Sequence, residues 1–401
     1  MQVVSFALSA VYSGTWFLRW ATVVVQKQMW RQLGWFSGLI CAGSVAGAVA
    51  WGAATQVFSF EFEGNAPGIN ARQQYTLAAL TCRWIAAFFI FYPVEFLCFI
   101  VAKLMMLGRL TTNVTRSLQV YATQESSEGG GKRGKMANRS LLVIVYRVIA
   151  GAVVLCSVGC LVALYVAGAY NLQAAMIFDR AAAACDVQGN DTNSSLAVLT
   201  ESTAKLNQSG TTTSVQGFLE AIALLLISTA YLVLVPLSVA MLRRAERAGA
   251  HALVAVSAKT AKTDASEPKL EAAIAIVDES IQAAAKQRRH LVIACLVVLI
   301  TFPARAAYDL LYAYSNFMAP GDPACGICDP CQSNQFLIGV WMGYTPEFQP
   351  IVVALSSPLP LSVSLWIITS AHAKAYEISV NILRTRFGRA VTRPADATLS
   401  G

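Results

Sequence analysis

Charged side chains are scarce in this chain of 401 residues. Asp, Glu, Lys and Arg together make up 13% of it, about half the share of an ordinary soluble domain. Histidine occurs three times, and no HExxH, GxSxG or intramembrane histidine pair is present. These absences argue against an enzyme, and we expect no cofactor and no metal site. Disorder is excluded as well, because 56% of the chain is apolar.

The apolar residues gather in runs of about 20, which is long enough to cross the hydrocarbon core of a bilayer as α-helices. The sequence therefore predicts an all-α polytopic membrane protein, with a seven-transmembrane helix bundle over residues 1–376 and a cytosolic tail over 377–401. The predicted spans are 2–24, 34–57, 74–106, 141–168, 217–242, 291–314 and 345–370.

The distribution of Lys and Arg predicts the orientation of the bundle. With the N-terminus outside, 22 of the 30 Lys and Arg residues fall on inner segments and 3 on outer ones. This asymmetry obeys the positive-inside rule. The net charge of +8 then reflects cytosolic segments that face anionic lipid rather than nucleic acid. We expect the lipid bilayer as a partner, in the plasma membrane or an endomembrane of the secretory pathway.

A polar segment, 169–216, is predicted to be the longest outer loop. It carries three N-glycosylation sequons, at Asn190, Asn193 and Asn207. Three acceptor sites within about 20 residues of one polar segment favour a glycosylated loop over chance occurrence. We therefore expect a glycoprotein.

Five of the ten cysteines lie on the predicted outer side, where disulfides are the default. Cys82 is near the outer end of the third span and Cys185 is in the long outer loop, so a bridge between them would tie that loop over the bundle. Cys325, Cys328 and Cys331 form a cluster in the last outer loop. Three cysteines without a nearby histidine favour a local disulfide over zinc, which needs four ligands. One of the five cysteines is then left unpaired or joins another chain.

The cytosolic segments also show helical patterns. Residues 243–290 are predicted to extend the fifth and sixth spans as two helices, since an apolar stripe follows the helix-start signal Ser266-Glu267-Pro268. These helices either pack only on each other or form a docking surface for a cytosolic protein. Residues 377–401 begin with a basic amphipathic pattern, typical of a helix on the membrane surface.

Ionisable residues within the spans are functional candidates, because burying a charge in a bilayer is costly. Arg305 and Asp309 are one helical turn apart on the sixth span, where they can neutralise each other. Glu95 of the third span and Arg147 of the fourth lie at matching depths and form a second predicted pair. Each pair either has a structural role or contacts a ligand or an ion.

Further candidates lie at the outer end and at helix breaks. Arg83 and Glu347 are placed to line an outer pocket, with Glu347 in the first turn of the seventh span. Pro303, Pro358 and Pro360 interrupt the helical hydrogen bonds of the last two spans and predict hinges. Small residues at four-residue spacing on the second and fourth spans predict close helix packing, with a homodimer face as the alternative.

The predicted arrangement resembles the G-protein-coupled receptors. The resemblance lies in the seven spans, the outer N-terminus and inner C-terminus, the positions of Cys82 and Cys185, the long third inner loop and the surface helix after the seventh span. It is topological and lacks the rhodopsin-like motifs: Arg109 follows Leu107-Gly108 without an acidic neighbour.

The resemblance implies a receptor-like protein. A small or lipid-like outer ligand would bias the sixth and seventh spans, which would signal to a cytosolic partner. Two alternatives stay open. One is a transporter or channel in which the intramembrane charges line a path. The other is a scaffold whose segment 243–290 recruits a soluble protein.

Overall fold

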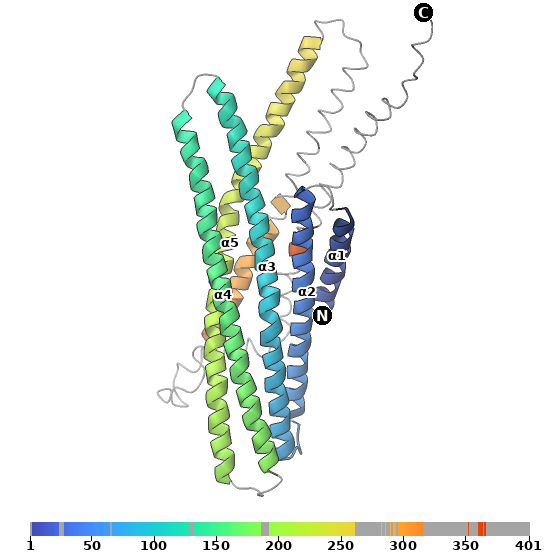
Figure 1. The fold of residues 1–401 in the computed structure, drawn as a ribbon, viewed down its shortest axis with the longest axis vertical. Coiled ribbons are helices and arrows are strands. Elements are labelled where there is room, and N and C mark those ends of the chain that lie inside the picture. Colours follow the sequence, from blue (N-terminus) through green and yellow to red (C-terminus); the bar gives the residue numbers. More distant parts are fainter. Residues whose placement is uncertain are drawn as a thin grey trace, which may run out of the picture. The chain divides into compact units, whose positions relative to one another are not determined.

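A computed structural model describes most of the chain. The described residues are 2–23, 28–64, 66–127, 132–185, 192–260 and 296–315, with isolated positions at 282, 285, 289, 292, 293, 352, 360–363 and 365. They are almost entirely helical, and no strand occurs among them. Five helices are labelled in Figure 1: α1 (Gln2–Val23), α2 (Gln28–Gly64), α3 (Ala71–Ser127), α4 (Lys132–Ala184) and α5 (Thr192–Thr260). Residues 296–315 form a further helix, called the 296–315 helix below.

Five helical segments are long and apolar enough to cross a membrane. They are Gly34–Gly64, Ala71–Thr112, Leu142–Ala184, Ala197–Ala240 and Leu296–Ser315. They coincide with the second to sixth predicted spans, and the chain is a multi-pass helical membrane protein. The first predicted span corresponds to a shorter apolar helix, Val3–Leu18. Most of the seventh, 345–370, lies outside the described residues.

The helices continue well past the predicted spans. Helix α3 has 57 residues, which corresponds to about 85 Å at 1.5 Å per residue, against a hydrocarbon core of about 30 Å. The predicted outer loop 169–216 is therefore corrected: it is helical to Ala184 and again from Thr192. Its polar residues do not interrupt the helices because small side chains, such as those of Ala174 and Ala181, are buried along them.

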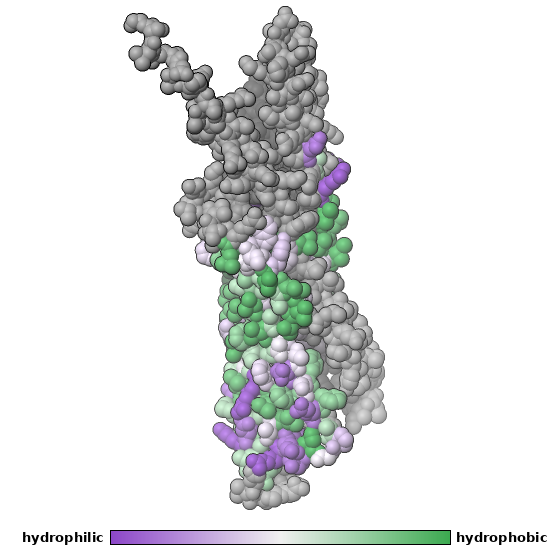
Figure 2. Space-filling view, turned by 90° about the vertical axis from the view of Figure 1, so that its right-hand side faces the viewer, coloured by the Kyte–Doolittle hydropathy of each residue, from purple (hydrophilic) through white to green (hydrophobic). Residues whose placement is uncertain are grey.

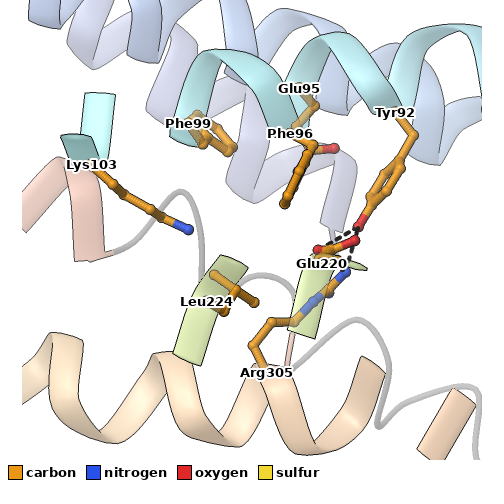
Figure 3. Close-up of a pocket in the computed structure, with 8 residues that line it drawn as sticks. All are labelled: Tyr92, Glu95, Phe96, Phe99, Lys103, Glu220, Leu224 and Arg305. Atoms are coloured by element: carbon orange, nitrogen blue, oxygen red, sulfur yellow. Dashed lines mark hydrogen bonds and ion pairs between the residues drawn. The ribbon is translucent and has the colours of Figure 1, made fainter. Parts of the chain in front are cut away.

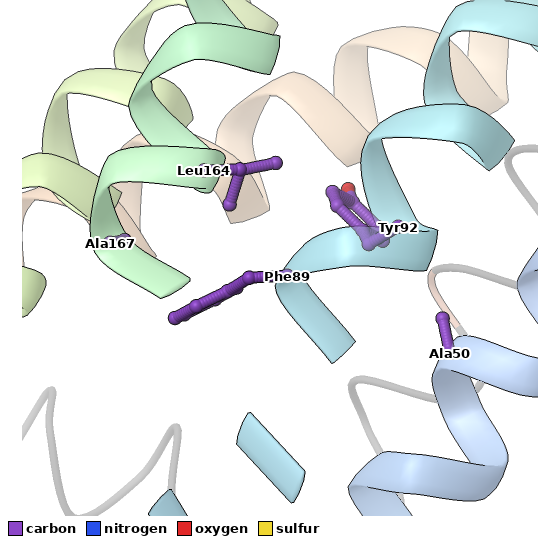
Figure 4. Close-up of a cluster of buried hydrophobic side chains, with 5 residues drawn as sticks. All are labelled: Ala50, Phe89, Tyr92, Leu164 and Ala167. Atoms are coloured by element: carbon purple, nitrogen blue, oxygen red, sulfur yellow. The ribbon is translucent and has the colours of Figure 1, made fainter. Parts of the chain in front are cut away.

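The described chain divides into two compact units. The first contains residues 1–241 and 295–362, and the second contains 242–294 and 363–401. Within the first unit, α1 packs on α2, α2 on α3 and α3 on α4. One apolar cluster that joins α2, α3 and α4 is drawn in Figure 4 and consists of Ala50, Phe89, Tyr92, Leu164 and Ala167. The candidate site lies entirely within this first unit.

Glycines allow the helices of this unit to approach closely. A Cβ atom on Gly43 would lie 2.8 Å from the Phe99 ring of α3, and one on Gly159 would lie 2.8 Å from Leu219 of α5. At these distances a larger residue would force the neighbouring side chain to shift, which supports the predicted close packing of the second and fourth spans. Both glycines are used within one chain, so a homodimer would need another face.

The surface of the first unit carries many large apolar side chains. On α4 they include Val148, Leu155 and Val162, all more than half exposed. Figure 2 shows an apolar zone across the middle of the described part and hydrophilic residues gathered toward one end. A water-soluble protein rarely exposes so much apolar surface, whereas a lipid bilayer covers it favourably.

Candidate functional site

Five charged side chains are buried among the described residues of the first unit. They are Glu95 and Lys103 of α3, Glu220 of α5, and Arg305 and Asp309 of the 296–315 helix, with exposed fractions between 2 and 6%. All five lie within segments that can span the membrane. Charged groups at such depth are expensive, so their presence marks a functional candidate. We call this group the buried charge cluster.

Arg305 connects three helices at the centre of the cluster. Its Nη2 atom donates to the Tyr92 hydroxyl at 2.6 Å and lies 3.2 Å from Oε1 of Glu220 (Figure 3). Its Nε atom lies 2.9 Å from Oδ1 of Asp309, one turn further along the same helix. The predicted Arg305–Asp309 pair is thus confirmed. Two carboxylates share one guanidinium, and the Nη1 atom of that guanidinium has no hydrogen-bond partner.

Glu220 is the best-satisfied carboxylate of the cluster. The Tyr92 hydroxyl lies 2.9 and 3.0 Å from its two oxygens, and the Gln216 amide donates to Oε2 at 2.5 Å. The sequence reasoning missed Glu220, although one acidic residue near the start of the apolar run 217–242 was a visible signal. It also missed Tyr92, whose role depends on helix register.

Glu95 faces α2 rather than α4. A Cβ atom built on Gly47 of α2 would lie 3.0 Å from the Glu95 carboxyl carbon. One Glu95 oxygen, Oε2, has no hydrogen-bond partner. Trp51 lies one turn beyond Gly47 on the same face of α2, and its indole N–H is directed toward the Glu95 carboxyl group, although no hydrogen bond of ordinary length forms between them.

The expected Glu95–Arg147 pair is not formed. Arg147 is exposed on α4, whereas Glu95 is buried in the core. Tyr146, the residue before Arg147, donates to the Leu104 carbonyl of α3, nine residues after Glu95 and about 14 Å along the helix, so the predicted matching depth is wrong. In addition, α4 turns Arg147 outward. Arg147 therefore does not belong to the buried charge cluster.

Lys103 completes the cluster. It lies eight residues after Glu95 on α3, about 12 Å along the helix. Its Nζ atom is 4.2 Å from the centre of the Phe302 ring, a cation–π contact between α3 and the 296–315 helix. No ion pair of Lys103 is found in the described part of the chain.

A small cavity lies inside the cluster, with a volume of about 10 Å³. Its polar lining consists of Tyr92, Glu95, Lys103, Glu220 and Arg305, and three apolar side chains of α3 and α5 complete it (Figure 3). A volume of this size is about the minimum for one water molecule. The arrangement can therefore hold one water molecule between charged groups of α3, α5 and the 296–315 helix.

Of the two outer pocket candidates, the structure describes only Arg83. Arg83 forms an ion pair with Asp179 of α4 at 2.5 Å, and both side chains are half-exposed. Glu347 lies outside the described residues. An exposed ion pair contributes little to stability. The described part of the chain therefore gives no support for an outer pocket built on Arg83.

The predicted Cys82–Cys185 disulfide is not supported, since both are free cysteines. Cys82 is buried against Ala174 and Ala175 of α4, and Cys185 is exposed ten residues further on, about 15 Å along the helix. A disulfide requires Cα atoms within about 7 Å. Because the predicted loop is helical, Cys185 cannot fold back to Cys82. Cys325, Cys328 and Cys331 lie outside the described residues.

The remaining predicted positions are only partly described. Asn207 is exposed within α5, Asn193 is in the first turn of α5, and Asn190 lies outside the described residues. Glycosylation stays a prediction at all three. The 296–315 helix continues across Pro303. Pro360 is an isolated helical position and Pro358 is not described, so the hinges also stay predictions.

The chain matches no protein-family model, no curated protein and no solved structure. The resemblance to G-protein-coupled receptors is therefore not confirmed by a relative. No group of three His, Cys, Asp or Glu residues that could hold a metal ion occurs in the described ranges.

Proposed function

We propose that the protein moves protons or small cations across its membrane, with the buried charge cluster as the ion site. One observation carries the proposal: three carboxyl groups and two cationic groups are buried inside membrane-spanning helices, and all of them except Asp309 line a water-sized cavity. With all five groups ionised, the cluster has one excess negative charge. An uncompensated charge in a low-dielectric interior is costly. One proton or one monovalent cation would remove that cost.

A purely structural role explains the cluster less well. Buried ion pairs are often no more stabilising than apolar residues of similar size. A structural network would also satisfy its members, but Glu95 Oε2 and Arg305 Nη1 lack hydrogen-bond partners. Intramembrane ionisable residues that face a bundle interior are typical of ion pathways and proton relays. The transporter alternative therefore has more support than the receptor hypothesis.

The proposal is tested with the purified full-length protein in liposomes. Fluxes of protons, Na⁺ and K⁺ are measured against protein-free liposomes under an imposed membrane potential. We expect flux of at least one of these ions, and loss of it in Glu220→Gln. The matched control is Arg147→Gln, an exposed charge outside the cluster, which should retain flux. Absence of flux for all three ions would refute the proposal.

A second proposal concerns a cytosolic partner. Helix α5 continues to Thr260, eighteen residues past the predicted end of its span at 242. This extension favours a docking surface for a cytosolic protein within 243–290, as a receptor or a scaffold would need. The full-length protein should then capture one specific partner. Mutation of the surface of 243–260 should abolish this capture without changing ion flux.

A further inference from the structure

We infer that the transported ion is a proton and that the carboxyl group of Glu95 takes it up. The inference rests on the proposed function and goes beyond it by naming the ion and its acceptor. It starts from a difference among the three buried carboxyl groups. Glu220 and Asp309 share the Arg305 guanidinium, whereas among the described residues Glu95 has no ion pair and its Oε2 atom has no hydrogen-bond partner.

The groups that face Glu95 do not hold its carboxyl group permanently in the ionised form. Helix α2 presents Gly47 and the Trp51 indole, and α1 presents the Phe6 ring, whose atoms would lie 2.5 Å from a Cβ on Gly47. The charged and titratable groups nearby are Tyr92 and Lys103 of α3, Glu220 of α5, and Arg305 of the 296–315 helix. Arg305 is engaged by two other carboxylates, and Lys103 lies over the Phe302 ring. Glu95 can therefore alternate between its charged and neutral forms without breaking an ion pair.

The cavity beside Glu95 fits a proton better than a metal cation. Its volume of about 10 Å³ holds about one water, whereas Na⁺, K⁺ or a divalent cation needs several oxygen ligands or a hydration shell. A proton needs one oxygen lone pair, and Glu95 Oε2 offers one that no donor occupies.

The proton transfer is balanced without another reactant. A proton passes from a hydronium ion in the cavity to a carboxylate oxygen of Glu95, which forms an O–H bond and leaves a water molecule. Release on the other side of the membrane is the reverse step, with water as the acceptor. No electrons move, and the excess negative charge of the cluster is present only when Glu95 is ionised.

The test measures proton and metal-cation transport with the same protein. Liposomes that contain the full-length protein are loaded with a pH-sensitive dye, and a K⁺ gradient with valinomycin sets an inside-negative potential. Parallel samples measure uptake of radioactive Na⁺. We expect the wild type to acidify the lumen without taking up Na⁺ above protein-free liposomes. Glu95→Gln should lower proton flux roughly a hundredfold, and Arg147→Gln should leave it unchanged.

The outcomes separate the inference from the proposed function. Na⁺ uptake without acidification would overturn the inference and leave ion transport standing. Proton flux of wild-type size in Glu95→Gln would also overturn it, because another group would carry the proton. Absence of any ion flux would remove the proposed function and the inference together.

A second measurement does not depend on transport. Infrared difference spectra recorded across a pH titration of the folded protein show the carbonyl band of a protonated carboxyl group. We expect a band that Glu95→Gln removes and Arg147→Gln retains, with both variants eluting as the wild type does in gel filtration. If Glu95→Gln is misfolded, Glu95→Asp replaces it and should shift the band. A spectrum that neither Glu95 variant changes would contradict the inference.

Discussion

The Nη2 atom of Arg305 lies 2.6 Å from the hydroxyl oxygen of Tyr92, a residue 213 positions earlier in the chain. This contact joins the 296–315 helix to α3 inside the candidate membrane region. Tyr92 accepts from Arg305 and donates to Glu220, so one hydroxyl links the cation to its carboxylate. The site thus depends on the register between helices that are distant in the sequence.

Removal of this hydroxyl should weaken the protein. In Tyr92→Phe, Arg305 loses an acceptor and Glu220 loses a donor, and neither can reach bulk water. We expect the free energy of unfolding to fall by about 1–3 kcal/mol. Thermal unfolding in detergent, followed by intrinsic fluorescence, measures the change. Tyr165→Phe is the matched control because Tyr165 is exposed on α4; equal melting temperatures for the two variants would contradict this role of Tyr92.

Arg305 and Glu220 should be energetically coupled. Arg305→Gln leaves two buried carboxylates without a cation, and the expected loss of stability is about 3–5 kcal/mol. Adding Glu220→Gln removes one of these unpaired charges, so the double variant should be more stable than Arg305→Gln alone. A double-mutant cycle based on unfolding midpoints measures the coupling. Additive effects of the two changes would show that the pair does not act as a unit.

Close packing at Gly47 should make this position intolerant of larger residues. In Gly47→Ala the new methyl group would lie 2.5 Å from the Phe6 ring and 3.0 Å from the Glu95 carboxyl carbon. We expect a loss of about 1–3 kcal/mol from overpacking. Gly52→Ala, on the same helix with no atom within 4 Å, should instead be neutral or stabilising by up to about 1 kcal/mol. The melting temperatures of the two variants are compared with that of the wild type. A Gly47→Ala variant as stable as the wild type would contradict the close packing at this position.

The thiols of Cys82 and Cys185 should react independently of reductant. Cys185 is exposed and should be alkylated by a water-soluble maleimide in the native protein, whereas the buried Cys82 should react only after unfolding. The remaining cysteines are changed to serine or alanine so that mass spectrometry reports these two alone. Labelling of Cys185 that requires a reducing agent would indicate a disulfide and contradict the structure.

The sequence predicted the local features of the site and missed the distant ones. Arg305 and Asp309 pair across one helical turn, and the turn fixes that spacing in any helix. The pairing of Glu95 with Arg147 was wrong because the two residues lie at different levels along α3 and Arg147 faces outward. A single sequence shows neither the register between two helices nor their rotation. Glu220 and Tyr92 are 128 residues apart and form a hydrogen bond. Their contact depends on the register between α3 and α5, which cannot be read from a single sequence.

Helix ends were harder to predict than spans. Apolar length located five membrane-capable segments correctly, because the bilayer sets that length. The polar residues of 169–216 were read as a loop. They lie instead on helices in which alanines are buried and Asn171 donates to Ser209 at 2.6 Å across the α4–α5 interface. Polar composition indicates exposure to water, and it does not exclude helix.

Movement of ions by the buried charge cluster would carry an electric current, which can be measured in proteoliposomes. Proteoliposomes of the full-length protein are adsorbed on a solid-supported membrane and exposed to steps in pH, Na⁺ and K⁺ concentration. We expect a transient current on the pH step that Arg147→Gln retains and that Glu220→Gln loses. Currents no larger than those of protein-free liposomes on all three steps would contradict ion movement by the cluster.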